Sequence, residues 1–368
     1  MTVSSENPFP KVEVVPSGRS SSSDAGLKEL FTRGDLWIGT GGAFTVAFAV
    51  EAVQSFVTGD PLWGWWSLAL LAAGIGVGLW GWWLRGRFRS SQPVGVVMQV
   101  ANPWRDSGEG DQRESNAREF GRKKCVLVAV TKIVFPEDRR TALLLVDQLV
   151  SHTRALKQVM ENLSPGASRV ELMPIMPLHA GFRAGARLGY THSREVMVHS
   201  VKASDHQNPV FPAVPLRVPQ HGAAAPSDLP LEADKQPRTI DGADPRRVAL
   251  ALDLQNRGEE FVEPVMEACR QYDFGSLVLV RTTTGWLPEN QETFSGIVDT
   301  ICDAWRQASL PEGAHTEQRA IFLSGPVAIA VALGARLATA NHNSWTAFTF
   351  DSDNGSYEPF PSTPRVRK

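Results

Sequence analysis

Two apolar runs near the N-terminus constrain the fold of this chain more than any other feature. They cover residues 36–57 and 62–84, and each matches the roughly 20 residues that a helix needs to cross a bilayer. The second run has no charged residue, and tryptophans stand at both of its ends, as at membrane–water boundaries: Trp63, Trp65, Trp66, Trp80, Trp82 and Trp83. Only a tight Thr-Gly-Asp-Pro turn separates the runs. We therefore predict a two-helix transmembrane hairpin over residues 35–90.

The charges that flank the hairpin predict its orientation. Lys28 and Arg33 precede it and Arg85, Arg87 and Arg89 follow it, whereas the turn carries only an aspartate. By the positive-inside rule, both termini are then cytoplasmic and the protein spans the membrane twice. A secretory signal peptide is the alternative interpretation of the first run. It is disfavoured because the run starts late, contains an acid, and is followed at once by a second span.

Two features inside the hairpin are candidates for function. Gly74 and Gly78 allow close helix approach, either within one hairpin or between protomers. Glu51, with Gln54 one turn later, places a carboxylate inside an apolar run, which is costly and typical of functional sites. We consider Glu51 and Gln54 as pore-lining residues, with the alternative that Glu51 reaches the lipid headgroups.

Composition narrows the classes of ligand and of cysteine site that the chain can have. A net charge of −2 disfavours a broad basic face for long nucleic acids but permits a local site for a small anion. The three cysteines are far apart and form no CxxC or Cys/His pair, so we predict buried free thiols, no disulfide and no zinc site: Cys125, Cys269 and Cys302.

The rest of the chain predicts an α/β protein with two halves. We expect a disordered N-terminus and juxtamembrane segment (1–34), a first α/β half (91–202), a proline-rich connector without regular structure (203–246) and a second α/β half (247–368). Expected strands alternate with helices in both halves, which predicts a parallel, doubly wound sheet: 94–100, 125–130, 170–175 and 196–201, then 248–254, 277–280, 320–323 and 345–350. Residues 105–124 are polar and charged, and we predict a loop with some helix there.

The two halves repeat in residues as well as in pattern. Residues 177–188 (PLHAGFRAGARL) match 326–337 (PVAIAVALGARL), and Phe120-Gly121 matches Phe274-Gly275. Both offsets are about 150 residues, the signature of a duplicated unit. We therefore expect two pseudo-symmetric, Rossmann-like halves.

The closing stretch resembles the C-terminus of SAVED domains. It carries a small-Gly-Pro turn, a helix ending in GxxL, an aromatic-acidic pair and a Gly-x-Tyr: Ser324-Gly325-Pro326, residues 334–337, Phe350-Asp351 and residues 355–357. The resemblance covers residues 94–360 and is weaker in the first half. It implies a SAVED domain of two fused CARF-like subdomains that binds a cyclic oligonucleotide between its halves, such as the cyclic trinucleotide cyclic tri-adenylate.

Together with the hairpin, the chain resembles the membrane-spanning SAVED effectors of cyclic-oligonucleotide-based anti-phage signalling (CBASS) or of type III CRISPR systems. The resemblance implies a bacterial inner-membrane protein whose messenger comes from a nucleotidyltransferase or a CRISPR polymerase. Messenger binding would produce a homo-oligomer that disrupts the lipid bilayer and causes abortive infection. No metal or further cofactor is implied.

A ligand of a parallel sheet sits beyond the carboxyl ends of its strands, and its phosphates take N–H groups at helix starts. We therefore expect ligand contacts from the first half at Asn102, Trp104, Thr131, Lys132, Pro177 and His179, and from the second at Asp253, Gln255, Arg281, Thr282, Thr283, Ser324, Gly325 and Pro326. The alternatives are a structural role for the Gly-Pro turn and a surface ion pair for Arg281. Arg187 and Arg336 lie late in their helices, where a dipole or surface-pair role is expected.

No catalytic motif is recognisable. The sequence has no HExxH, GxSxG or GxxxxGK[ST] pattern, so we expect a receptor that is not an enzyme. The alternatives are a membrane-tethered hydrolase or nucleotide-processing enzyme and, as a third interpretation, a regulatory subunit of a transporter.

Overall fold

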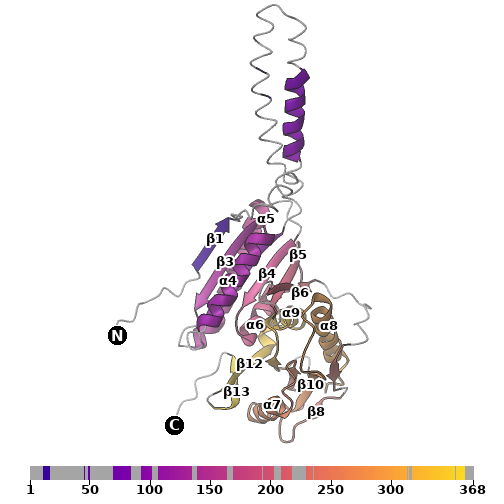
Figure 1. Ribbon diagram of the computed structural model, residues 1–368. Coiled ribbons are helices and arrows are strands. Elements are labelled where there is room, and N and C mark those ends of the chain that lie inside the picture. Colours follow the sequence, from indigo (N-terminus) through magenta and orange to yellow (C-terminus); the bar gives the residue numbers. More distant parts are fainter. Residues whose placement is uncertain are drawn as a thin grey trace, which may run out of the picture.

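A computed structural model contains two β-sheets with helices between and outside them (Figure 1). It describes residues 11–16, 45, 49, 69–83, 93–101, 107–134, 139–163, 169–192, 194–202, 209–217, 229–234, 236–312, 314, 317–352 and 354–360.

Each sheet has a parallel centre and antiparallel edges. Sheet A has the order β1 (Lys11–Pro16), β3 (Leu127–Val134), β2 (Val94–Ala101), β4 (Arg169–Ile175), β5 (Glu195–Val201) and β6 (Val210–Leu216), with β1 and β6 antiparallel. Sheet B has the order β13 (Ser356–Phe360), β12 (Trp345–Asp351), β11 (Arg319–Ser324), β9 (Val248–Asp253), β10 (Ser276–Thr282) and β7 (Leu231–Ala233), and β8 (Arg238–Thr239) also pairs with β10. The order β3-β2-β4-β5-β6 recurs as β10-β9-β11-β12-β13, in agreement with the predicted duplication.

The helices fall into an inner and an outer set. One helix covers the outer face of each sheet, and four pack into the main core between the sheets: α4 (Ser107–Lys124) and α7 (Glu259–Gln271) outside, α5 (Arg139–Leu163), α6 (Leu178–Leu188), α8 (Gln291–Gln307) and α9 (Val327–Leu337) inside. The main core contains buried residues of both sheets, so the two halves share one hydrophobic interior.

The inner helices α6 and α9 lie side by side and carry the duplicated motif (Figure 1). Gly185 faces the carbonyl of Val331, and Gly334 faces the carbonyl of Phe182, so closely that a Cβ at either glycine would overlap that carbonyl. These contacts are equivalents of each other under the repeat. Gly181 in turn lies beside Val327, so the helices run parallel and their first turns adjoin.

Three expectations about regular structure are wrong. Residues 11–16 form strand β1 within the segment expected to be disordered, and residues 107–124 form one continuous helix, α4, where a loop with some helix was expected. The segment 203–246, expected to lack regular structure, contains β6, β7 and β8. Strand β6 carries Pro212 and Pro215 at a sheet edge, where the missing N–H groups cost little.

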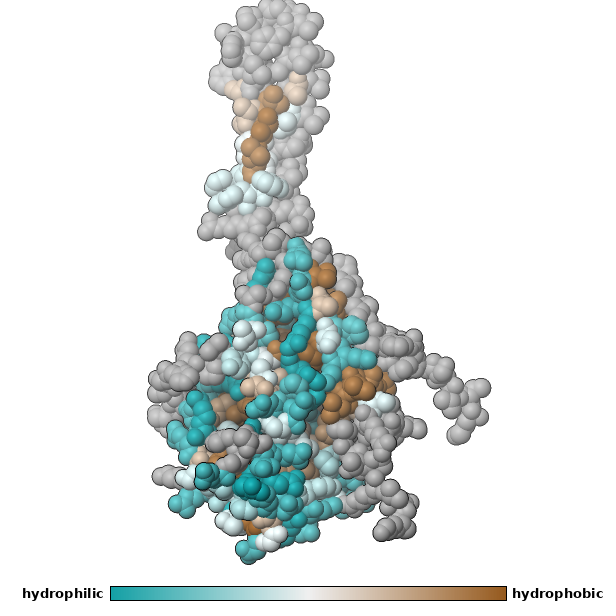
Figure 2. Space-filling model, turned by 180° about the vertical axis from the view of Figure 1, so that it is seen from behind, coloured by the Kyte–Doolittle hydropathy of each residue, from teal (hydrophilic) through white to brown (hydrophobic). Residues whose placement is uncertain are grey.

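Part of the segment predicted to form the hairpin is among the described residues. Residues 69–83 are helical, as are Thr45 and Ala49, whereas Glu51, Gln54 and the rest of residues 36–57 lie outside the described residues. Gly74 is buried and Gly78 is half-buried. Figure 2 shows a stripe of hydrophobic side chains along this helix. Within the described ranges, no helix meets the length and hydropathy needed to span a bilayer.

The α6–α9 contact gives a stability prediction. Gly185→Ala should lower the free energy of unfolding by about 1–3 kcal/mol or more, because the new methyl group must push the two helices apart. The same change at Gly110 in α4, where no described atom lies within 4 Å of the Cβ position, should instead add about 0.5–1 kcal/mol. Thermal unfolding of the full-length chain checks both. Equal melting temperatures for the two variants would contradict the close contact.

Candidate ligand site at the paired helix starts

The first turns of α6 and α9 adjoin at the carboxyl-end side of both sheets. Each helix follows a parallel strand directly, since β4 leads into α6 and β11 leads into α9. Pro177 and Pro326 occupy the N-cap positions, and neither makes a side-chain cap hydrogen bond. Proline fixes φ for the helix start but donates no hydrogen bond. The structure therefore brings together the four predicted residues Pro177, His179, Gly325 and Pro326.

The electrostatics of this place favour an anion. The first N–H groups of a helix have no intrahelical acceptor, and each N-terminus carries the positive end of a dipole worth about half a charge. Neither first turn contains an acidic residue. Two parallel helices therefore direct two positive dipole ends to one region, which suits phosphates.

The turn before α9 is held by the loop that follows β9. Ser324 is buried, and its Oγ donates a hydrogen bond to Oε1 of Gln255 at 2.8 Å. The backbone of Leu254 donates to the carbonyl of Ser324 at 2.9 Å. Gly325 has a φ of +153°, and a Cβ there would lie 2.9 Å from Cβ of Leu254, so only glycine fits. Ser324 and Gln255 thus lie together at this turn, as expected.

Asp253 holds the same loop. Asp253 is 1% exposed, and its two carboxylate oxygens accept hydrogen bonds from the backbone N–H of Arg257 at 3.0 Å and of Gly258 at 2.8 Å. This arrangement requires left-handed backbone at Asn256 and Gly258. The carboxylate is therefore engaged in shaping the loop rather than in reading a base edge.

The predicted residues of β10 have other structural partners. Arg281 pairs with Glu232 of β7 at 2.9 Å, which is the surface ion pair of the alternative interpretation. The hydroxyl of Thr282 is buried 3.0 Å from the carbonyl of Pro230, and the side chain of Thr283 is exposed. Strand β9 lies between β10 and β11, so these residues are not adjacent to the turn before α9.

In the first half, the end of β3 differs from the prediction. The strand runs to Val134, so Thr131 and Lys132 lie inside it rather than after it. Thr131 is fully buried, and Lys132 pairs with Glu114 of α4 at 3.2 Å. Asn102 and Trp104 lie outside the described residues.

His179 is placed by a contact with the other half. Its ring lies 4.4 Å from the ring of Phe360, the last residue of β13. The first turn of α6 is thus attached to sheet B. A ligand at the helix starts would therefore contact both halves at once.

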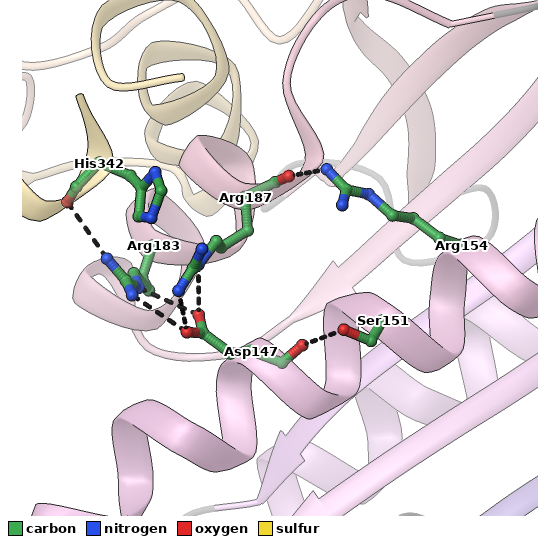
Figure 3. A network of polar contacts seen from close by, with 6 residues as sticks. All are labelled: Asp147, Ser151, Arg154, Arg183, Arg187 and His342. Atoms are coloured by element: carbon green, nitrogen blue, oxygen red, sulfur yellow. Dashed lines mark hydrogen bonds and ion pairs between the residues drawn. The ribbon is translucent and has the colours of Figure 1, made fainter. Parts of the chain in front are cut away.

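The sequence did not reveal a polar network at the other end of α6 (Figure 3). The Asp147 carboxylate accepts from Arg183 at 3.1 and 3.0 Å and from Arg187 at 2.9 Å. Arg183 also donates to the carbonyl of His342 at 3.1 Å, which joins the two halves. In the second half, Arg336 pairs with Asp299 in the same way, so the duplicated arginine is a structural ion pair. In the sequence, the tetrapeptide GARL that is repeated at 185–188 and 334–337 was the signal that could have pointed to these two arginines.

A second buried pair lies under α4. His199 Nε2 and Glu171 Oε2 are 2.6 Å apart, and Arg169 donates to the other oxygen of Glu171 at 2.6 Å. Burial raises the pKa of the Glu171 carboxyl, but His199 and Arg169 outweigh it and hold that pKa below its usual value. The pKa of Asp147 is likewise raised by burial and lowered more strongly by Arg187 and Arg183. Among the described residues, no three His, Cys, Asp or Glu side chains form a candidate metal site.

The Asp147 network predicts acid lability. Because the folded pKa values of Asp147 and Glu171 lie below their unfolded values of about 4, their stabilisation is present above that pH and lost as the pH falls through the lowered values. Asp147→Asn should cost about 1.5–3 kcal/mol at pH 7 and flatten the loss of stability below about pH 4.

Asp303→Asn is the matched control, since its pair with Arg306 is exposed and should contribute less than about 1 kcal/mol. The measurement is the melting temperature of the wild-type chain and of both variants from pH 7 to pH 3. An Asp147→Asn variant as stable as Asp303→Asn would contradict the role of the network.

Comparison with known proteins gives similarity at the level of solved structures. No protein-family model and no curated protein matches the sequence. The chain is similar to the Acinetobacter baumannii Cap4 SAVED/CARF-domain containing receptor with the cyclic trinucleotide 3'3'3'-cAAA, at 11% identity and a TM-score of 0.45 over 79% of this chain and 55% of that chain. For the Moraxella osloensis Cap4 receptor the identity is 9% and the TM-score 0.37, over 80% and 59%. The chain thus spans little more than half the length of these receptors.

Proposed function

We propose that this chain is a SAVED-type membrane effector of bacterial anti-phage defence that binds a cyclic oligonucleotide at the paired starts of α6 and α9. The observation that carries the proposal is the convergence of two uncapped helix starts from duplicated halves, with no acid in either first turn. A cyclic oligonucleotide presents several phosphates in a closed ring. Such a ligand can place one phosphate at each helix start.

Residues of the predicted hairpin support the second part of the proposal, which is that the chain acts on a membrane. Leu79, Trp80 and Trp82 are 60%, 58% and 71% exposed. Exposure of such apolar side chains to water is unfavourable in free energy, whereas a bilayer would bury them. Two helices cannot surround a channel, so one hairpin is too small to enclose a pore and several must assemble. Ligand-induced homo-oligomerisation would therefore precede disruption of the bacterial inner membrane and abortive infection. The messenger would come from a nucleotidyltransferase or CRISPR polymerase, and the chain itself would carry no catalytic activity.

Ligand binding is tested by thermal stabilisation against cyclic di-, tri- and tetranucleotides. A ligand at 100 times its Kd should add about 2.7 kcal/mol to the free energy of unfolding. We expect this for a cyclic trinucleotide such as cyclic tri-adenylate. The matched pair Leu178→Asp and Leu178→Asn isolates charge at the first position of α6.

An acid at this position suits the helix dipole but repels a phosphate, so Leu178→Asp should fold and bind at least tenfold more weakly than Leu178→Asn. Equal affinity of the two variants would exclude the helix start as the phosphate site.

Membrane disruption is tested with the full-length chain in dye-loaded vesicles. We expect leakage that requires the cyclic trinucleotide and rises more steeply than linearly with protein density, because several hairpins must assemble. Leakage independent of any cyclic oligonucleotide would refute the ligand-gated effector. Turnover of the nucleotide without a change of oligomeric state would favour the membrane-tethered hydrolase.

A further inference from the structure

The edge of sheet A at which its parallel strands begin is rich in basic residues. The strand register brings the ends together there, since Arg169 of β4 lies opposite Glu195 of β5, and Leu216 of β6 lies opposite Val196. Basic residues stand in the last turn of α4, at the start of β4, directly before β5 and directly after β6: Arg122, Lys123, Lys124, Arg169, Arg194 and Arg217. We call these six residues the basic edge.

Acidic residues at the same place do not balance this charge. Among the described residues, three acids accompany the six cations: Glu119, Glu171 and Glu195. Glu171 is buried, so it does not face the solvent. Lys157 and Glu161, near the end of α5, add one charge of each sign. The edge therefore has an excess of positive charge, although the whole chain has a net charge of −2.

The duplicated second half provides an internal comparison. Helix α7 covers sheet B as α4 covers sheet A, but its last turn has one basic residue, Arg270, where α4 has three. At the start of β9, each arginine is paired with an aspartate: Arg246 with Asp244, and Arg247 with Asp273. A single cation already complements a helix dipole. The excess is thus specific to the half that follows the predicted hairpin in the sequence.

The basic edge is tethered to the helical residues 69–83. The chain enters β2 at this edge, and ten residues lead from Trp83 to Pro93. Whatever their conformation, ten residues span at most about 36 Å. Figure 1 shows residues 69–83 on the side of sheet A where β3 begins. A bilayer that holds residues 69–83 is therefore within reach of the basic edge.

The spacing of the cations suits an extended anionic surface. From β3 to β6 there are four strand spacings, which is about 19 Å. Adjacent groups along this edge are then separated by no more than about the Debye length of 10 Å at 0.1 M salt, so they act on one surface together. Each lysine or arginine close to an anionic bilayer strengthens binding by about fivefold.

We propose that the basic edge docks on anionic lipid headgroups and holds the α/β domain against the bilayer in one orientation. This inference rests on membrane insertion of the hairpin, which is part of the proposed function. The candidate ligand site follows the carboxyl ends of the strands, at the opposite edge of sheet A. In the docked orientation that site faces away from the lipid, where a soluble messenger can reach it.

Docking is tested with the full-length chain in vesicles that carry nitroxide-labelled headgroups, which quench a fluorophore on close contact. The fluorophore is attached through Asn162→Cys, an exposed position at the end of α5 beside the basic edge, and the native cysteines are all buried. We expect quenching to be at least about twofold stronger with phosphatidylglycerol than with phosphatidylcholine. It should weaken when the salt rises from about 0.1 M to 1 M, because the Debye length falls to about 3 Å.

Two triple variants that each remove three exposed cations separate the basic edge from charge in general. The first is Arg122→Gln with Lys123→Gln and Lys124→Gln in α4. The matched control changes exposed arginines of the second half: Arg246→Gln with Arg270→Gln and Arg306→Gln. The α4 variant should lose at least about half of the phosphatidylglycerol-dependent quenching, whereas the control should keep it.

Equal quenching with the two lipids, or equal quenching of the two triple variants, would overturn the docking surface. The salt series on the wild-type chain gives the same decision if the α4 variant misfolds. If the chain does not insert into vesicles, the membrane part of the proposed function fails. Co-sedimentation of the chain with preformed phosphatidylglycerol vesicles then still decides whether the basic edge binds anionic lipid.

Discussion

The close contact between α6 and α9 is the constraint on which the rest of the structure depends. Gly185 and Gly334 each meet a carbonyl of the other helix, so the two helices can lie parallel with almost no gap. That contact fuses the interiors of both halves into one core and sets the two helix starts side by side. A larger side chain at either glycine would separate the halves and the helix starts together.

The duplicated motif GARL contributes two interactions to this arrangement, one from its glycine and one from its arginine. Its glycine permits the contact, and its arginine anchors the helix to the preceding one, through Asp147 in the first half and Asp299 in the second. Arg183, which has an alanine at its equivalent position, adds a bond to the carbonyl of His342 across the halves. The cationic side chains are thus committed to the far ends of α6 and α9. The positive character at the near ends comes from backbone N–H groups, which are suited to a ligand because they need no rearrangement to bind phosphate.

How far the sequence predicts the structure depends on the element. Central strands such as β2 and β9 are continuous apolar runs, and their positions were predicted closely. Edge strands were missed because β1 lies between prolines in a polar, serine-rich segment and β6 contains two prolines. The helix starts were found from the repeat, whereas the role of Asp253 depends on a loop whose left-handed residues the pattern does not reveal. The network of Asp147 was missed because it exists only once α5 and α6 have packed.

In the proposed complex, one anionic ring ligand bridges the two helix starts. The most direct test is an experimental structure of the full-length chain with bound cyclic tri-adenylate. We predict phosphate oxygens about 2.7–3.2 Å from backbone nitrogens in the first turns of both α6 and α9. A ligand held by one half alone, or bound away from both helix starts, would contradict it.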